Sequence, residues 1–453
     1  MPKKKTALTI EERLQQALVP AEEQPYEVPE NWVWVRLGAI AEIVTGGTPS
    51  KKHPEYYGGN FPFYKPSDLD QGRLTYDASE YLSEEGKNVS RIIPKNSTAV
   101  CCIGSIGKCG YLMCEGTTNQ QINSAIPKIN SLCLYYYLCT ENFVQDLLSM
   151  ASATTIAIVN KSKMESCAFP LPPLSEQQRI VERIEELLAK LDEAKERLQE
   201  VADSFAVRKA AILHKAFTGE LTKQWRRENG VSYESWEEKK GEDFFEYVTS
   251  GSRGWAKYYS DKGSIFIRMG NLNHGTIELD FSDIQYVELP DQVEGQRSKL
   301  QKNDILISIT ADVGMIALVR EDMDAYINQH VALARPKNDL YAEFLAWYFV
   351  SDDGLQQMQN KQRGATKIGL GLQDIRSIIL KIPTLPEQHE IVRLIDDLLA
   401  RERAAQQAAE QALASIDLMK KSILARAFRG ELGTNKASEA SALELLKQVL
   451  AEN

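Results

Sequence analysis

Residues 171–201 read LPPLSEQQRIVERIEELLAKLDEAKERLQEV, and residues 212–221 read ILHKAFTGEL. The same pattern returns 211 residues later, where residues 382–412 read IPTLPEQHEIVRLIDDLLARERAAQQAAEQA and residues 423–432 read ILARAFRGEL. No insertion or deletion interrupts this alignment. A rigid helix requires such a constant register, because one extra residue would rotate every later side chain by about 100°. The two stretches therefore predict two long helices of the same design.

Local signals support a helix in each copy. Ser175 and Gln178 form a capping box in the first copy, and Pro386 suits the first turn of the second. Apolar residues recur at heptad spacing in the first copy, at Ile180, Ile184, Leu187, Leu191, Ala194, Leu198, Val201 and Phe205. The second copy has a weaker seam, at Ile391, Ile395, Leu398, Glu402, Ala405, Ala409, Ala412 and Ile416. Two unrelated surface helices would not share one register, so we expect an antiparallel coiled coil.

The segments that precede the two helices also correspond, although more loosely. Trp32 aligns with Trp236, and the stretch Phe63–Leu69 aligns with Phe266–Leu272. The offset between the copies grows from 203 to 211, so the second copy has slightly longer loops. Short strand-like runs separated by Gly, Asn and Pro turns are found at Ala99–Ile103, Ile305–Ile309 and Val331–Ala334. Each segment is therefore predicted to fold as a mixed α/β globule.

The predicted fold class is mixed α/β, with two α/β globules alternating with two long helices in a pseudo-twofold internal repeat. A chain of 453 residues exceeds one ordinary domain. The expected parts are a helical extension at 1–30, the first globule at 31–173, the first helix at 174–222, a linker with the second globule at 223–384, the second helix at 385–432, and a tail helix at 433–453. Similar helices with divergent globules indicate one scaffold that carries two different readers.

The composition is that of a globular protein, with 43% hydrophobic and 26% charged residues. No apolar run approaches the roughly 20 residues that cross a bilayer, and the first residues lack the apolar stretch of a signal peptide. We therefore expect a cytoplasmic protein with no membrane partner. The net charge of −10 does not exclude a nucleic acid, because binding depends on where cations cluster.

Motifs of catalysis are missing from the sequence. It contains no P-loop, no dinucleotide-binding glycine motif following a strand, no zinc-protease motif and no Asn/Asp-Pro-Pro-aromatic motif of an amino-methyltransferase. Five scattered histidines offer little material for acid–base or metal chemistry. The sequence therefore predicts a chain that is not an enzyme and that holds no catalytic residue, metal or cofactor.

All seven cysteines lie between Cys101 and Cys167 and form no CxxC pair. Their odd number in a reducing compartment favours free thiols that behave as small hydrophobic residues over metal or redox chemistry.

Polar residues suited to DNA gather in loops of both globules. Lys, Arg, Ser and Thr contact phosphates, whereas Asn, Gln and Arg read base edges. The candidates in the first globule are Thr48, Ser50, Lys51, Lys52, Lys65, Ser67, Asp68, Ser105, Lys108, Asn119, Gln120, Gln121, Thr154 and Thr155. Those in the second are Ser252, Arg253, Lys257, Arg268, Asn271, Asn273, Asp312, Asn328, Gln329, His330, Arg363, Thr366 and Lys367. The alternative is that these are ordinary turn and surface residues.

Taken together, these features resemble the specificity (S) subunit of type I restriction–modification systems. The resemblance rests on the doubled motifs Pro172–Gln177 with Ala216–Leu221 and Pro383–Gln388 with Ala427–Leu432, and on the Gly46–Ser50 and Tyr64–Leu69 stretches. It covers about residues 31–432. The second globule departs from the pattern, with Ser252-Arg253 where Pro-Ser is expected.

The resemblance implies that each globule is a target-recognition domain that reads one half of a bipartite, asymmetric site in double-stranded DNA. It also implies that the helices dock two methyltransferase subunits, which bind S-adenosylmethionine and methylate adenine N6. Restriction subunits that use ATP and Mg would add translocation and cleavage. In this family the chain behaves as if circularly closed, so the resemblance also implies that the two ends of the chain meet near one end of the coil.

Two alternatives remain open at the level of sequence. One is a coiled-coil scaffold whose globules bind proteins. The other is the specificity chain of a related system whose nuclease is fused to the methyltransferase.

Overall fold

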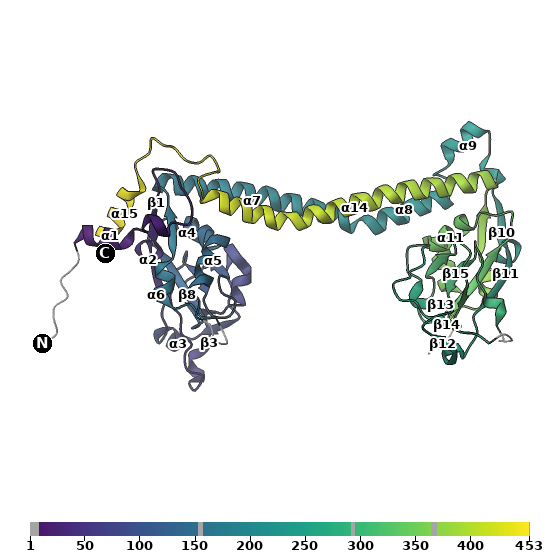
Figure 1. Ribbon diagram of the computed structural model, residues 1–453, viewed down its shortest axis with the longest axis horizontal. Coiled ribbons are helices and arrows are strands. Elements are labelled where there is room, and N and C mark those ends of the chain that lie inside the picture. Colours follow the sequence, from purple (N-terminus) through teal and green to yellow (C-terminus); the bar gives the residue numbers. More distant parts are fainter. Residues whose placement is uncertain (1–8, 153–156, 291–294, 364–368, 453) are drawn as a thin grey trace. The chain divides into compact units, whose positions relative to one another are not determined.

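The computed structural model describes residues 9–152, 157–290, 295–363 and 369–452. The chain forms two units, one of residues 1–198 with 411–453 and one of residues 199–410. Each unit contains one globule and parts of both long helices (Figure 1).

The first globule is built on a four-stranded antiparallel sheet in the order β2-β8-β5-β6. A smaller sheet, β4-β3-β7, includes the parallel pair β3–β7, and a ribbon of β1 and β9 closes the globule. The strands are β1 (Val33–Arg36), β2 (Ala41–Thr45), β3 (Tyr57–Tyr64), β4 (Glu80–Leu82), β5 (Thr98–Cys101), β6 (Cys109–Tyr111), β7 (Thr117–Thr118), β8 (Ile122–Pro127) and β9 (Ala168–Leu171). The helices are α2 (Leu37–Ile40), α3 (Glu84–Asn88), α4 (Ser131–Leu138), α5 (Glu141–Ser149) and α6 (Lys161–Ser166).

The second globule repeats this plan with the sheets β11-β18-β15-β16 and β12-β14-β13-β17 and the ribbon β10–β19. Its strands are β10 (Glu237–Lys240), β11 (Phe245–Ser250), β12 (Tyr259–Ser260), β13 (Ser264–Ile267), β14 (Tyr286–Val287), β15 (Ile305–Ser308), β16 (Ile316–Leu318), β17 (Ala325–Ile327), β18 (Val331–Pro336) and β19 (Ile379–Ile382). Its helices are α10 (Gly241–Phe244), α11 (Ala342–Val350), α12 (Asp352–Asn360) and α13 (Leu372–Arg376). The parallel pair β13–β17 corresponds to β3–β7.

A β-bulge explains where the two copies drift out of register. Ala41 pairs with Pro127, and Phe245 likewise pairs with Pro336, but the next pair in the second globule joins Tyr247 to Arg335 and skips Glu246. This extra residue makes Gly251 the counterpart of Gly46.

The core of each globule includes one helix that is apolar on nearly all sides. Six of the eight residues of α4 and all nine residues of α11 are buried, as expected for a helix enclosed by its globule. The seven cysteines are free thiols, four of them buried, and burial raises the pKa of Cys102 to about 12.

The long helices pack antiparallel within each unit. In the first unit α7 (Leu174–Asp203) packs against the end of α14 (Leu385–Ala427), and Asp192 binds Lys420 at 2.6 Å. In the second unit α8 (Phe205–Phe217) packs against the start of α14, and Arg208 pairs with Glu402. The predicted fold class is thereby confirmed. The first helix differs from the prediction in one respect, because it is interrupted at Ser204, where the Arg208 guanidinium donates to the Val201 carbonyl at 3.1 Å.

The tail of the chain packs against the N-terminal segment within the first unit. Helix α15 (Ala442–Ala451) lies against α1 (Ile10–Ala17), where Arg13 donates to the Leu450 carbonyl at 3.2 Å. The backbone N–H of Ala442 donates to the Asn31 carbonyl at 2.8 Å. The expected meeting of the two ends is therefore present.

Among the described residues, no helix is both long enough and apolar enough to cross a membrane.

Candidate functional site

A buried glutamate attaches each long helix to its globule. In the second unit Glu387 is fully buried and accepts hydrogen bonds from Trp236 Nε1 at 3.1 Å and Thr222 Oγ1 at 2.7 Å. The guanidinium of Arg226, itself buried, forms an ion pair with Glu387 at 2.6 Å. This carboxylate thus joins the start of α14, the segment that follows α8, and the start of the globule.

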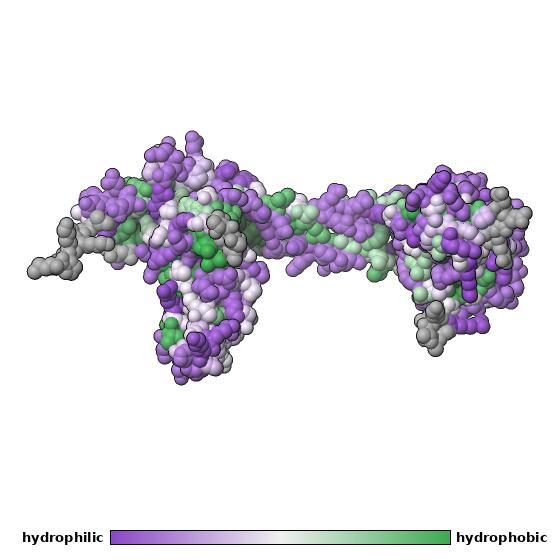
Figure 2. All heavy atoms as spheres, turned by 60° about the horizontal axis from the view of Figure 1, so that its bottom comes forward, coloured by the Kyte–Doolittle hydropathy of each residue, from purple (hydrophilic) through white to green (hydrophobic). Residues whose placement is uncertain are grey.

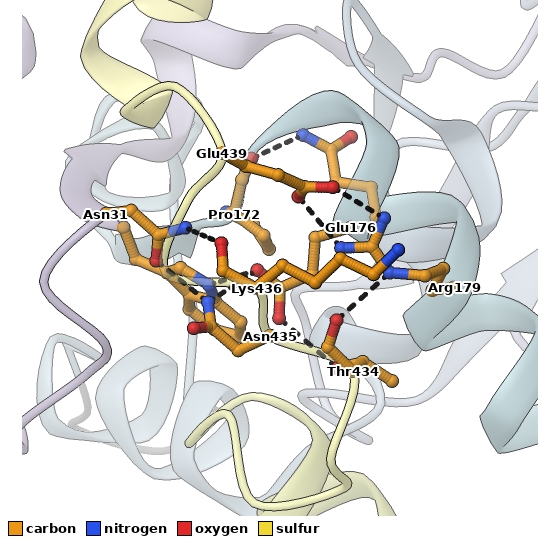
Figure 3. A network of polar contacts seen from close by, with 10 residues as sticks. Asn31, Pro172, Glu176, Arg179, Thr434, Asn435, Lys436 and Glu439 are labelled. Atoms are coloured by element: carbon orange, nitrogen blue, oxygen red, sulfur yellow. Dashed lines mark hydrogen bonds and ion pairs between the residues drawn. The ribbon is translucent and has the colours of Figure 1, made fainter.

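Glu176 occupies the equivalent place in the first unit (Figure 3). It accepts from Trp32 Nε1 at 2.7 Å, Thr434 Oγ1 at 3.2 Å and Asn435 Nδ2 at 2.8 Å. A second contact braces the same tail, because Arg179 binds Glu439 through two hydrogen bonds of 2.8 and 2.9 Å. Thr434 and Asn435 here take the place that Thr222 and Arg226 take in the second unit.

The glutamine that follows each glutamate bridges two backbone segments. Gln177 accepts from the N–H of Asn130 at 3.0 Å and donates to the Pro172 carbonyl at 2.9 Å. Gln388 accepts from the N–H of Tyr341 at 2.9 Å and donates to the Pro383 carbonyl at 2.9 Å. The repeated Glu-Gln pair is therefore explained by attachment of a helix to a globule.

The Ala-Phe motif anchors the far end of each helix. Phe428 is buried against Tyr137, with ring centroids 5.1 Å apart. Phe217 packs against Phe344 and Tyr348 at 5.4 and 5.3 Å. Each globule therefore holds the beginning of one long helix and the end of the other.

In both globules, loops converge where the parallel strand pair ends. We call this the loop edge, formed by residues 46–52, 65–67, 103–108 and 119–121 in the first globule and by residues 251–257, 268–273, 309–312 and 328–330 in the second. Gly47 donates to the Thr118 carbonyl at 2.8 Å, and Asn119 donates to the Tyr64 carbonyl at 3.1 Å. Ser252 bridges to Asn328, which donates to the Ile267 carbonyl at 3.0 Å.

Glycine is required where these loops begin. A Cβ atom on Gly46 would lie 2.2 Å from the Asn119 carbonyl oxygen, and one on Gly251 would lie 1.9 Å from the Ile327 carbonyl oxygen. Only glycine allows this close approach of two backbones. Glycine at these two positions thus allows the backbones of each loop edge to lie in contact.

Comparison with known proteins agrees with this doubled architecture. The family model described as the type I restriction modification DNA specificity domain matches residues 29–203 and again residues 233–412. The chain belongs to this family.

Two relatives align with this chain over nearly their whole length. The type I restriction enzyme EcoBI specificity subunit of Escherichia coli is 28% identical over 460 residues, which cover 94% of this chain and 93% of that protein. The EcoKI specificity subunit of Escherichia coli strain K12 is 24% identical and covers 94% of this chain and 96% of that protein. The crystal structure of the HsdS subunit from Thermoanaerobacter tengcongensis superposes with a TM-score of 0.66 at 18% identity, over 90% of this chain and 99% of that one. This structural likeness shows the shared fold.

Several of the residues that the sequence predicted to contact DNA are exposed on the loop edges. Lys51 and Lys52 are exposed and form no ion pair among the described residues, and the same holds for Arg253. The other exposed or half-exposed candidates are Thr48, Ser50, Ser67, Ser105, Gln120, Gln121, Ser252, Lys257, Asn273, Asp312, Gln329 and His330. Some of these also bind neighbours, as Asp312 binds His274 at 2.8 Å.

Four other candidates support the loops from within. Asp68 is buried and accepts from the N–H groups of Lys65 at 2.7 Å and Ser79 at 3.1 Å. Asn271 accepts from the N–H of Arg268 at 2.8 Å. Asn119 and Asn328 each accept, at 3.0 Å, from the N–H two residues later. These side chains shape turns, and the neighbouring residues form the exposed surface.

The remaining cations carry an acid partner. Lys65 binds Glu80 at 2.9 Å, Lys108 binds Asp70 at 2.6 Å, and Arg268 binds Asp283 at 2.7 Å; Arg363 binds Asp374 at 2.9 Å. Thr154, Thr155, Thr366 and Lys367 lie outside the described residues.

The sequence analysis missed Glu80 and Asp283. Their signal was present, because they are 203 residues apart, as are Phe63 and Phe266 of the alignment. No group of three or more His, Cys, Asp or Glu side chains arranged to hold a metal occurs among the described residues.

Proposed function

We propose that this chain is the DNA sequence-specificity subunit of a type I restriction–modification complex. Each globule would read one half of a bipartite, asymmetric site in double-stranded DNA. The observation that carries the proposal is that two globules of one fold, both matched by the specificity-domain model, present different side chains at equivalent places on their loop edges. Lys65 in the first globule is equivalent to Arg268 in the second, and Gln121 is equivalent to His330.

The paired helices would dock two methyltransferase subunits, one for each repeat. Val207 and Leu418 are 211 residues apart and are 71% and 67% exposed on their helices. Hydrophobic surface is visible along the helical segment in Figure 2. Exposed apolar side chains at equivalent positions suit two copies of one protein partner.

The partner subunits would carry out the catalytic reactions. The methyltransferase subunits would bind S-adenosylmethionine and methylate adenine N6, and restriction subunits would use ATP and Mg. The chain itself would be non-catalytic, hold no cofactor, and work in the cytoplasm, where these partners and DNA meet.

The test is a domain exchange followed by mapping of methylated adenines. The full chain is assembled with its methyltransferase, and residues 31–173 are replaced by the equivalent domain of a relative. One half of the methylated motif should change while the other half stays the same. A change in both halves by a folded complex, or methyl transfer by the chain without a second subunit, would contradict the proposal.

A further inference from the structure

Arg268, on the loop edge of the second globule, has partners at both its backbone N–H and its guanidinium. Asn271 accepts from the Arg268 N–H at 2.8 Å and donates to the carbonyls of Asp280 and Asp283 at 2.9 and 2.8 Å. The Arg268 guanidinium in turn binds the Asp283 carboxylate at 2.7 Å. The Arg268 backbone is therefore held by Asn271, while its guanidinium forms a surface ion pair with Asp283, whose side chain is 83% exposed.

The first globule contains the same arrangement with a lysine. Asp68 accepts from the Lys65 N–H at 2.7 Å, and the Lys65 ammonium binds Glu80 at 2.9 Å. Lys65 and Arg268, Asp68 and Asn271, and Glu80 and Asp283 are each 203 residues apart. The device is thus repeated, while the cation and its acid differ between the globules.

The lysine pair lies beside the glycine-rich loop. The Tyr57 hydroxyl donates to the Pro49 carbonyl at 2.6 Å, which fixes that loop against β3. Burial raises the pKa of Tyr57, the Glu80 carboxylate raises this pKa further and the Lys65 ammonium lowers it, so both members of the ion pair act on this phenol. The pair therefore stands among residues 46–52 and 65–67, where the loops converge.

The acid partner argues against a phosphate contact. A carboxylate beside a cation repels a phosphate and cancels part of the attraction. Lys51, Lys52 and Arg253 form no ion pair among the described residues, so they suit phosphates better. A planar guanidinium matches O6 and N7 of guanine with two hydrogen bonds, and an acid that fixes its orientation lowers the entropy lost on binding.

We propose that Arg268, positioned by the turn that Asn271 closes and paired with Asp283, reads a guanine in the half-site of the second globule. Lys65, held by Glu80, reads a base in the same way in the first globule. This inference rests on the proposed function and adds the residues that choose a base.

The experiment maps methylated sites for the complex with wild-type chain and with Arg268→Gln. The mapped motif should contain a guanine in the second half-site, and the variant should lose its preference there by about tenfold or more while all other positions stay the same. Asp283→Asn should relax the same position by a smaller factor. The matched control is Arg253→Gln on the same loop edge, which should weaken methylation at all sites equally and leave the motif unchanged.

Each other outcome has a defined meaning. A second half-site without guanine, an unchanged motif in Arg268→Gln, or uniform weakening like that of Arg253→Gln would overturn the inference. If Arg268→Gln does not fold by thermal unfolding, Arg268→Lys decides, because it keeps the charge and should still relax the guanine position. Absence of site-specific methylation by the wild-type complex would instead overturn the proposed function.

Discussion

The two buried glutamates, Glu176 and Glu387, each attach a long helix to a globule, but they do so with different hydrogen-bond donors. Glu387 is neutralised by the buried guanidinium of Arg226, whereas Glu176 is held by Trp32, Thr434 and Asn435, all neutral donors. The repeat has thus kept the acceptor and the geometry while the charge of the donor has changed. Direct contact with a cation is therefore not needed at this place, although a cation is near Glu176: the pKa of Arg179 is raised by its hydrogen bonds to Glu439 and also by the Glu176 carboxylate.

The two sites also differ in where their donors come from. Thr222 and Arg226 follow α8 directly and lie in the same continuous unit as Glu387. Thr434 and Asn435 are more than 250 residues away from Glu176 in the chain. The second unit completes its site from within one stretch of sequence, whereas the first depends on a distant segment.

The largest effect should come from removing the tail from Thr434 onward. This deletion removes two donors to Glu176, the brace between Arg179 and Glu439, and the buried side chains of α15. Hydrogen exchange should show loss of protection in the first unit and unchanged protection in the second. Unchanged exchange around α1 and the start of α7 would mean that the tail does not support the first unit. Glu452→Ala is a suitable control, because this residue is exposed.

A smaller but still large effect is expected for Glu387→Gln. The change leaves the Arg226 guanidinium buried without its counter-ion, which costs about 3–5 kcal/mol of unfolding free energy. Denaturant unfolding measures this cost, and hydrogen exchange shows whether the loss of stability is confined to the second unit. The control is Glu390→Gln in the same helix, whose ion pair with Arg393 lies at the surface and should matter little.

Glu176→Gln should have the smallest effect of the three. The amide keeps one oxygen acceptor and leaves no buried cation unpaired, so the cost should be about 1–3 kcal/mol, confined to the first unit. Equal costs for Glu176→Gln and Glu387→Gln, measured by the same unfolding experiment, would show that the charge of Arg226 does not distinguish the two sites.

Much of the fold could be predicted from the sequence, because the residues with which a helix contacts its partner recur at short, regular intervals along the chain. The heptad spacing from Ile180 and the constant offset of 211 residues required two similar helices that pair. The interruption at Ser204, where the Arg208 guanidinium donates to the Val201 carbonyl, was not predicted, because the apolar spacing continues past this residue to Phe205. The bulge at Glu246 was not predicted either, because it is visible only in the pairing of β11 with β18.

The candidate site was less predictable, since an Asn or Asp in a loop has the same sequence signal whether it closes a turn or faces solvent. Burial separates the two, because Asp68 and Asn271 are buried and each accepts from the backbone N–H of the cationic residue three positions earlier. The motif residues Gln177 and Gln388 were recognised by their repetition. Their bonds to the N–H groups of Asn130 and Tyr341 join segments 47 residues apart, a contact that spacing alone does not reveal.

The division of the first unit into residues 1–198 and 411–453 has a consequence during synthesis. A ribosome adds about 5–20 residues per second, so the stretch of 199–410 delays the second part by about 10–40 s. Throughout that interval the globule that emerged first lacks Phe428 and the donors to Glu176, while the second unit can already close around Glu387. The second unit can then be completed before the first, and a chain that ends at residue 410 contains all the residues of the second unit but lacks residues 411–453 of the first.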